Sequence, residues 1–193
     1  MTVQNDMEAL FPELALINDR NLREQCAAVW EEVLDSNGWS EETVRLCPVA
    51  PASLRDDCPE CCLDHCRRVT RLCAVLYDEL SDLFRLTGMC DRDDLLAAAV
   101  LHDVGKFAEC QPKNGSVHKC SRAKYFKHPV VGAYYAEKHG LPWKVVHAIL
   151  AHSDGLSPQG QRASMTPESL LLKKADYICY DYLALFYKRE EQL

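Results

Sequence analysis

A short apolar segment, residues 95–100 (LLAAAV), runs almost directly into a histidine and an aspartate, His102 and Asp103. A helix that is apolar on all sides belongs in the core of a globular protein. An ionised carboxylate at the end of such a helix is costly to bury unless something compensates its charge. The chain must therefore fold around this helix and place a compensating group beside Asp103, and a bound cation is the simplest one.

The hydrophobic periodicity is helical along nearly the whole chain, with little sustained two-residue alternation. We expect an all-α fold, a single helical bundle with an N-terminal helical extension. Capping residues, glycines and prolines place its helices at about residues 19–36, 63–86, 91–105, 128–140, 142–153 and 167–187. We expect a proline-rich linker over residues 47–59. The polar segment 109–127 is expected to be a loop or short helical turn over the site.

The composition limits the class of protein. A chain of 193 residues with 48% hydrophobic residues is long enough for one well-filled core and short for two. Its 22 Lys and Arg against 29 Asp and Glu give a net charge of −7 without a basic block, which argues against a general nucleic-acid binder. No apolar run approaches the roughly 20 residues of a membrane span, and acids in residues 1–20 are unlike a secretion signal. We expect a cytoplasmic protein.

Eleven cysteines in a chain of this size, without an export signal, are expected to be free thiols packed as small apolar side chains. The alternative concerns the run CPECC at residues 58–62, because a Cys-x-x-Cys pair can hold zinc. A tetrahedral site needs two more ligands, and Cys110 and Cys120 offer only an irregular second pair.

Two further ionisable residues lie on apolar helix faces. His65 precedes Val69 by four residues on the expected core-facing stripe of its helix, and Asp176 lies four residues after Leu172 on the stripe of the last helix. A carboxylate inside an apolar stripe is not a solvated surface charge, so Asp176 also requires a cation.

Each candidate has a structural interpretation when taken alone. His128 could have no role beyond starting a helix before Pro129. Lys106 could stabilise a helix C-terminus by about 0.3–1 kcal/mol. Arg68 could form an ordinary salt bridge. Taken together, the imidazoles and carboxylates at the ends of four or five helices favour one common pocket. They are His65, His102, Asp103, His128, His152 and Asp176.

The order of these motifs carries a resemblance. The chain reads H-x-x-R-V at residues 65–69, LHDVGK at 101–106, HP-x-x-GA at 128–133, AH at 151–152 and ADY at 175–177. This order resembles the HD-domain metal-dependent phosphohydrolases of the HDIG type, over roughly residues 60–185. The resemblance implies that His65, His102, Asp103 and Asp176 hold one metal. It further implies that His128 and His152 bind a second metal, with Asp103 bridging the two.

The chemistry that the resemblance implies is hydrolysis of a phosphate ester or anhydride by a metal-activated water. The ligand set suits two divalent ions of iron, manganese, zinc or cobalt, with magnesium as a further option. Asp103 and Lys106 would be catalytic, and Lys106 would bind the phosphoryl oxygens of the substrate. Arg68 would be a second substrate-binding residue. The substrate would be a small phosphorylated molecule, a nucleotide or a dinucleoside polyphosphate.

Several alternatives stay open. An HD-type di-iron oxygenase would use the same ligands, and a regulatory module would bind a nucleotide without turnover. Cyclic-dinucleotide cleavage is less favoured, because Ser153 and Asp154 follow His152 where such enzymes carry a Gly-Tyr-Pro element. We divide the chain into an N-terminal extension and linker, residues 1–57, and an HD domain, residues 58–193. The apolar side of the extension's helix could dock on the bundle or form a homodimer.

Overall fold

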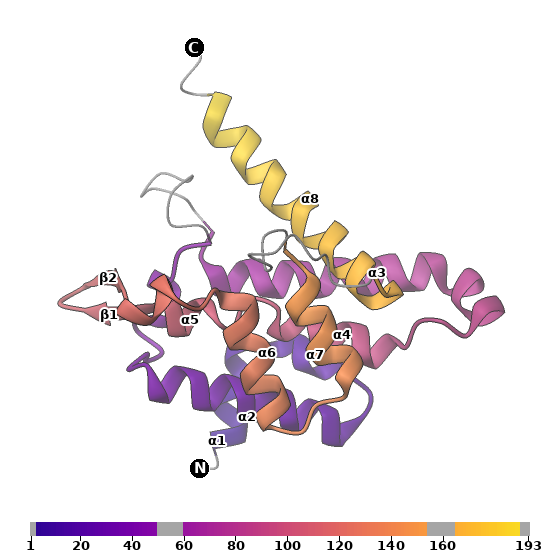
Figure 1. Cartoon of the computed structure of the whole chain (residues 1–193), viewed down its shortest axis with the longest axis horizontal. Helices are drawn as coiled ribbons and strands as arrows, with labels where there is room; N and C mark the ends of the chain where they lie inside the picture. The colour runs from indigo at the N-terminus through magenta and orange to yellow at the C-terminus, as the bar shows by residue number, and fades with distance from the viewer. Residues whose placement is uncertain (1–2, 50–59, 154–164, 190–193) are drawn as a thin grey trace.

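The computed structural model describes residues 3–49, 60–153 and 165–189, which form a helical bundle with one small hairpin (Figure 1). The all-α prediction is confirmed. The elements, in chain order, are α1 (Val3–Leu10), η1 (Pro12–Leu16), α2 (Arg20–Ser36), η2 (Val44–Leu46), α3 (Cys62–Thr87), α4 (Arg92–Leu101), α5 (Lys106–Glu109), β1 (Cys110–Lys113), β2 (Ser116–Lys119), η3 (Ser121–Lys124), α6 (His128–Lys138), α7 (Trp143–Ala151) and α8 (Pro167–Arg189).

Helix α4 is the central element, as its apolar sequence predicts. It contacts α2, α3, α7 and α8, and residues 95–101 are fully buried. Its start is fixed by two carboxylates: Asp91 caps it by accepting from the backbone N–H groups of Asp93 and Asp94. Asp93 in turn accepts from the N–H of Asp19, at the start of α2, at 2.7 Å. The start of α4 is therefore tied to the start of α2.

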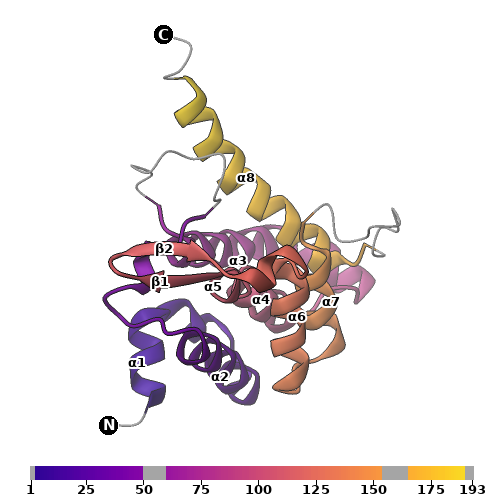
Figure 2. The ribbon, with the colours of Figure 1, turned by 60° about the vertical axis from the view of Figure 1, so that its left-hand side comes forward.

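The N-terminal helices share this core through a chain of aromatic rings. Trp30 of α2 lies with its ring centre 5.6 Å from that of Phe11 and 5.1 Å from that of Phe107. The indole N–H of Trp30 donates to the carbonyl of Val100 on α4 at 3.2 Å. The apolar side of α2 thus packs on the bundle of its own chain (Figure 2). A homodimer stays a prediction, and so does the domain boundary after residue 57, which lies outside the described residues.

The segment 109–127 differs from its prediction. Instead of a loop or short helical turn alone, it contains an antiparallel hairpin in which Cys110 pairs with Lys119, and the hairpin projects from the bundle (Figure 1). The strands are joined by Asn114 and Gly115, both with positive φ (52° and 75°). An Asn-Gly pair is a strong hairpin signal, but strands of four residues are too short to show a clear alternation.

No helix among the described residues combines the length and apolarity that crossing a lipid bilayer requires.

We expect Trp30→Ala to lower the free energy of unfolding by about 3–5 kcal/mol, because it removes a fully buried indole and leaves a cavity beside α4. Chemical denaturation followed by circular dichroism measures this change. Trp143→Ala is the control, because Trp143 is 75% exposed and its removal should change stability by no more than about 0.5 kcal/mol. Equal effects of the two variants would contradict the proposed role of Trp30 in the core.

Candidate metal centre

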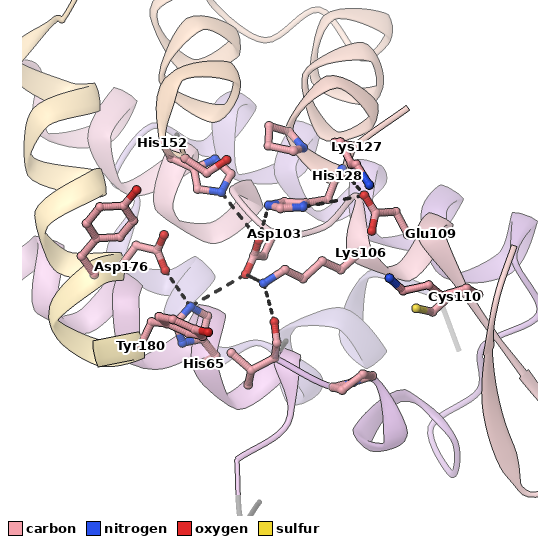
Figure 3. A pocket seen from close by; sticks show the side chains of 16 residues that line it. His65, Asp103, Lys106, Glu109, Cys110, Lys127, His128, His152, Asp176 and Tyr180 are labelled. Carbon is pink, nitrogen blue, oxygen red and sulfur yellow. Dashed lines mark hydrogen bonds and ion pairs between the residues drawn. The ribbon is translucent and has the colours of Figure 1, made fainter. Parts of the chain in front are cut away.

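A cavity of about 420 Å³ opens where α3, α6, α7 and α8 meet the end of α4 (Figure 3). Histidines and acids from five segments line it or lie directly behind its wall. His65 comes from the first turn of α3, His102 and Asp103 from the turn after α4, His128 from the start of α6, His152 from the end of α7, and Asp176 from α8.

Asp103 lies at the centre of this group and is almost completely buried. Its Oδ1 atom is 3.2 Å from the Nε2 atom of His128 and 3.6 Å from that of His152. Its Oδ2 atom is 3.5 Å from the Nε2 atom of His102 and 3.8 Å from that of His65. The two carboxylate oxygens thus face two different pairs of imidazoles.

Backbone carbonyls fix the orientation of two of these rings. The Nδ1–H of His102 donates to the carbonyl of Ala99 at 2.8 Å, and that of His152 donates to the carbonyl of Ile149 at 2.6 Å. A carbonyl can only accept, so each neutral ring carries its proton on Nδ1 and presents a lone pair at Nε2. This is the arrangement that metal-ligating histidines commonly adopt.

The charges in the site favour a neutral His102 ring beside an ionised Asp103 carboxylate. Burial lowers the pKa of His102 to about 4, so this ring is neutral at physiological pH. Burial alone would raise the pKa of Asp103, but the Lys106 ammonium and the surrounding imidazoles outweigh burial and hold it well below its usual range. The Nζ atom of Lys106 lies 2.5 Å from Oδ2 of Asp103.

The residues present fit a divalent metal ion. Among the described residues, Nε2 of His102 and Oδ1 of Asp103 are buried atoms without a well-aligned hydrogen bond. Two groups of donor atoms, each within 4.8 Å of one another, share Asp103: one adds His65 and His102, the other His128 and His152. Imidazole nitrogens combined with carboxylate oxygens suit first-row divalent ions.

Asp176 lies beside the first of these groups. Its Oδ1 atom lies 2.9 Å from Nε2 of His65 and 3.9 Å from Nε2 of His102.

Comparisons with known proteins agree with this geometry. The family model described as "HD domain" matches residues 62–181. The chain belongs to the HD-domain family. A relative, "Ribonuclease Y" of Cutibacterium acnes (strain DSM 16379 / KPA171202), is 28% identical over 158 residues, which are 81% of this chain and 24% of the relative. The chain thus spans about a quarter of that relative's length. No solved structure matches significantly.

A close backbone approach positions His128 in this HD domain. A Cβ atom added to Gly105 would lie 2.1 Å from the carbonyl oxygen of His128 and 2.9 Å from the backbone nitrogen of Gly132. Only glycine therefore lets the start of α6 lie against the turn that carries Asp103.

The structure places Arg68 away from the candidate centre. Its guanidinium bonds the buried carboxylate of Glu60 at 2.6 Å, and it lines shallow hollows between α3 and α8 rather than the cavity of the candidate centre. Arg68 lies three residues after His65, only about 60° away around the helix, so its ion pair with Glu60 rather than its helical position holds its side chain away from the cavity. The placement favours the salt bridge over substrate binding.

Sequence reasoning also missed several residues of the cavity. Glu109 accepts a hydrogen bond from the backbone N–H of His128, and its carboxylate lies 3.7 Å from Nδ1 of that ring. Lys119, Lys127 and Tyr180 line the cavity as well. Tyr180 could have been found, because it lies four residues after Asp176 on the same helix face. Lys119 depends on the hairpin, which was not predicted.

We expect Gly105→Ala to lower the metal content per chain, because the added methyl group forces α6 and His128 away from Asp103. Overpacking at this position should also lower stability by about 1–3 kcal/mol. Elemental analysis and thermal unfolding measure the two effects. Gly132→Ala is the milder control, because its Cβ would meet the side chain of Ile149 at 3.2 Å instead of a backbone. Unchanged metal content in Gly105→Ala would contradict this role.

Proposed function

We propose that this protein is a metal-dependent hydrolase of phosphate esters or anhydrides in small phosphorylated molecules. The observation that carries the proposal is the position of Asp103, whose two oxygens face separate histidine pairs while the Lys106 ammonium contacts the same carboxylate. This combination supports a site with metal ligands and a positive charge for a phosphoryl group at one cavity. Membership of the HD-domain family supports the same reaction class.

In this proposal His65, His102, Asp103 and Asp176 hold one divalent ion, and His128, His152 and Asp103 hold a second. When bound, such ions supply a water nucleophile at neutral pH and neutralise charge on phosphoryl oxygens. The protein's own groups set the geometry. The carbonyls of Ala99 and Ile149 orient two imidazoles, and Glu109 holds the start of α6 and its His128 in place.

Lys106 is the second catalytic group of the proposal. Its ammonium is fixed between Oδ2 of Asp103 and the carbonyl of Val49, at 2.5 and 2.6 Å. Burial alone would lower the pKa of Lys106, but Asp103 and Cys62 raise it, so the side chain stays charged. A fixed positive charge beside the metal ligands can stabilise negative charge that develops on a phosphoryl oxygen during cleavage.

The wall of the cavity indicates a substrate with more than one phosphate. Residues 110–127 contain five Lys and Arg and no acid, in a chain of net charge −7. Two of these lysines, Lys119 on β2 and Lys127 before α6, line the cavity itself. Two separate lysine ammonium groups in one cavity suit the repeated negative charges of a phosphate chain. We therefore propose a nucleotide or dinucleoside polyphosphate as the substrate.

Asp103→Ala tests the reaction. We expect phosphate release from nucleotides to fall to the background rate and bound transition metal to be lost, with the helical circular dichroism spectrum retained. The physical reason is that Asp103 faces both ligand groups. Asp181→Ala, which removes an exposed carboxylate of α8, is the matched control and should leave both quantities unchanged.

The same preparations separate the alternatives. Wild-type protein that contains no transition metal and whose melting temperature does not respond to manganese or a chelator would favour the regulatory module. Metal-loaded protein that consumes oxygen with ferrous iron and releases no phosphate would favour the oxygenase. Cleavage of RNA in preference to nucleotides would favour a ribonuclease activity, as the name of the Cutibacterium relative indicates for that protein.

Replacing Lys119 and Lys127 by glutamine tests the substrate class. We expect KM to rise about tenfold for substrates with three or four phosphates and little for monophosphates, because only a longer phosphate chain reaches both lysines. Steady-state kinetics with a series of phosphate lengths measures this. Lys113→Gln is the control, since Lys113 lies on the same hairpin but outside the cavity lining. Equal changes for all phosphate lengths would contradict the proposed chain-binding role.

A further inference from the structure

Three buried cysteines lie behind the wall of the cavity, on the side of α3 that faces Asp103. Cys62 and Cys66 are one helical turn apart at the start of α3, so their side chains lie on one face. Cys47 lies opposite Cys62 on the preceding segment, where the N–H of Cys62 donates to the carbonyl of Cys47 at 2.8 Å. All three cysteines are fully buried, and none lines the cavity.

Two of these cysteines, Cys62 and Cys66, form what we call the thiol cluster. Their sulfur atoms and a carboxylate oxygen of Asp103 all lie within 4.8 Å of one another. Three donor atoms, two of sulfur and one of oxygen, thus lie close together in the protein interior.

Buried cysteines are usually small apolar residues, and Cys26 in the middle of α2 is an example. The thiol cluster differs from Cys26 in its surroundings. It lies within 4.8 Å of the Asp103 carboxylate, which also binds the ammonium of Lys106. A positive charge is therefore already accommodated at this place in the protein.

We propose that Cys62, Cys66 and Asp103 form a further cation site for a thiophilic divalent ion such as zinc or cadmium. Sulfur-rich tetrahedral donor sets select such ions, whereas imidazole and carboxylate groups accept a wider range. Each cysteine that becomes a ligand releases its thiol proton to solvent. The ion takes the place of the Lys106 ammonium at Asp103.

This site shares its carboxylate with the candidate metal centre. An ion held by the thiol cluster draws Asp103 toward α3 and competes for the ligand that both histidine groups use. A thiophilic ion therefore inhibits the enzyme through Asp103. Binding at the thiol cluster does not depend on the proposed hydrolysis, and only this inhibition rests on it.

Cadmium titration of the purified protein, kept reduced with a phosphine, tests the binding. Cadmium–thiolate bonds give an ultraviolet charge-transfer absorption that histidine and carboxylate ligands do not give. We expect a saturable band in the wild type, its loss in the Cys62→Ala/Cys66→Ala double variant, and its retention in the matched control Cys26→Ala. Bands of equal size and affinity in all three proteins would overturn the proposal.

A measurement on the wild type alone covers the case in which the double variant does not fold. The ¹¹³Cd NMR resonance of the bound ion should show mixed sulfur and oxygen coordination, and a resonance typical of nitrogen and oxygen ligands alone would overturn the site. In preparations that release phosphate, inhibition by cadmium should shift to higher concentration in the double variant. Unchanged inhibition would overturn the sharing of Asp103. If the wild type shows the band but releases no phosphate, the proposed hydrolysis is contradicted and the proposed cation site is supported.

Discussion

The structure depends on compensating one buried negative charge, that of Asp103. An isolated carboxylate in a protein interior is too costly to persist. Here Lys106, His65, His102, His128 and His152 surround it, and each comes from a helix end or a turn that the bundle brings to the same place. Only one of these groups, the ammonium of Lys106, carries a permanent full charge. The neutral ring of His102 presents a lone pair instead, which is why the arrangement fits a metal ion and not only a salt bridge.

Much of this site could be predicted from the sequence because its residues lie at positions with local signals. His128 precedes a proline at the start of α6, and His102 and Asp103 follow a wholly apolar helix whose burial was evident. The helices themselves followed from capping residues and periodicity: Asp19 caps α2, and Gly140, with φ of 75°, follows the end of α6. Such signals depend on a few neighbouring residues, so they can be recognised without knowledge of the tertiary structure.

The features that escaped prediction depend on distant contacts. Glu109 acquires its role only because α5 and α6 meet, and Arg68 is held away from the cavity by its ion pair with Glu60. The hairpin that carries Lys119 was too short for a period of two residues to be visible. The thiol cluster was missed for a similar reason. Its two cysteines are one helical turn apart in the sequence, but Asp103 approaches them only in the folded chain.

The hydrogen bond from the indole of Trp30 to Val100 has a practical consequence for work on this family member. Val100 lies three residues before Asp103, so an N-terminal side chain occupies a carbonyl that the last turn of α4 would otherwise leave without a partner. The family match begins at residue 62. A fragment trimmed to that limit would expose the ring of Phe107 and remove the support of the turn that carries His102 and Asp103. Expression vectors for this protein should therefore retain the leading helices, even though they contribute none of the candidate ligands.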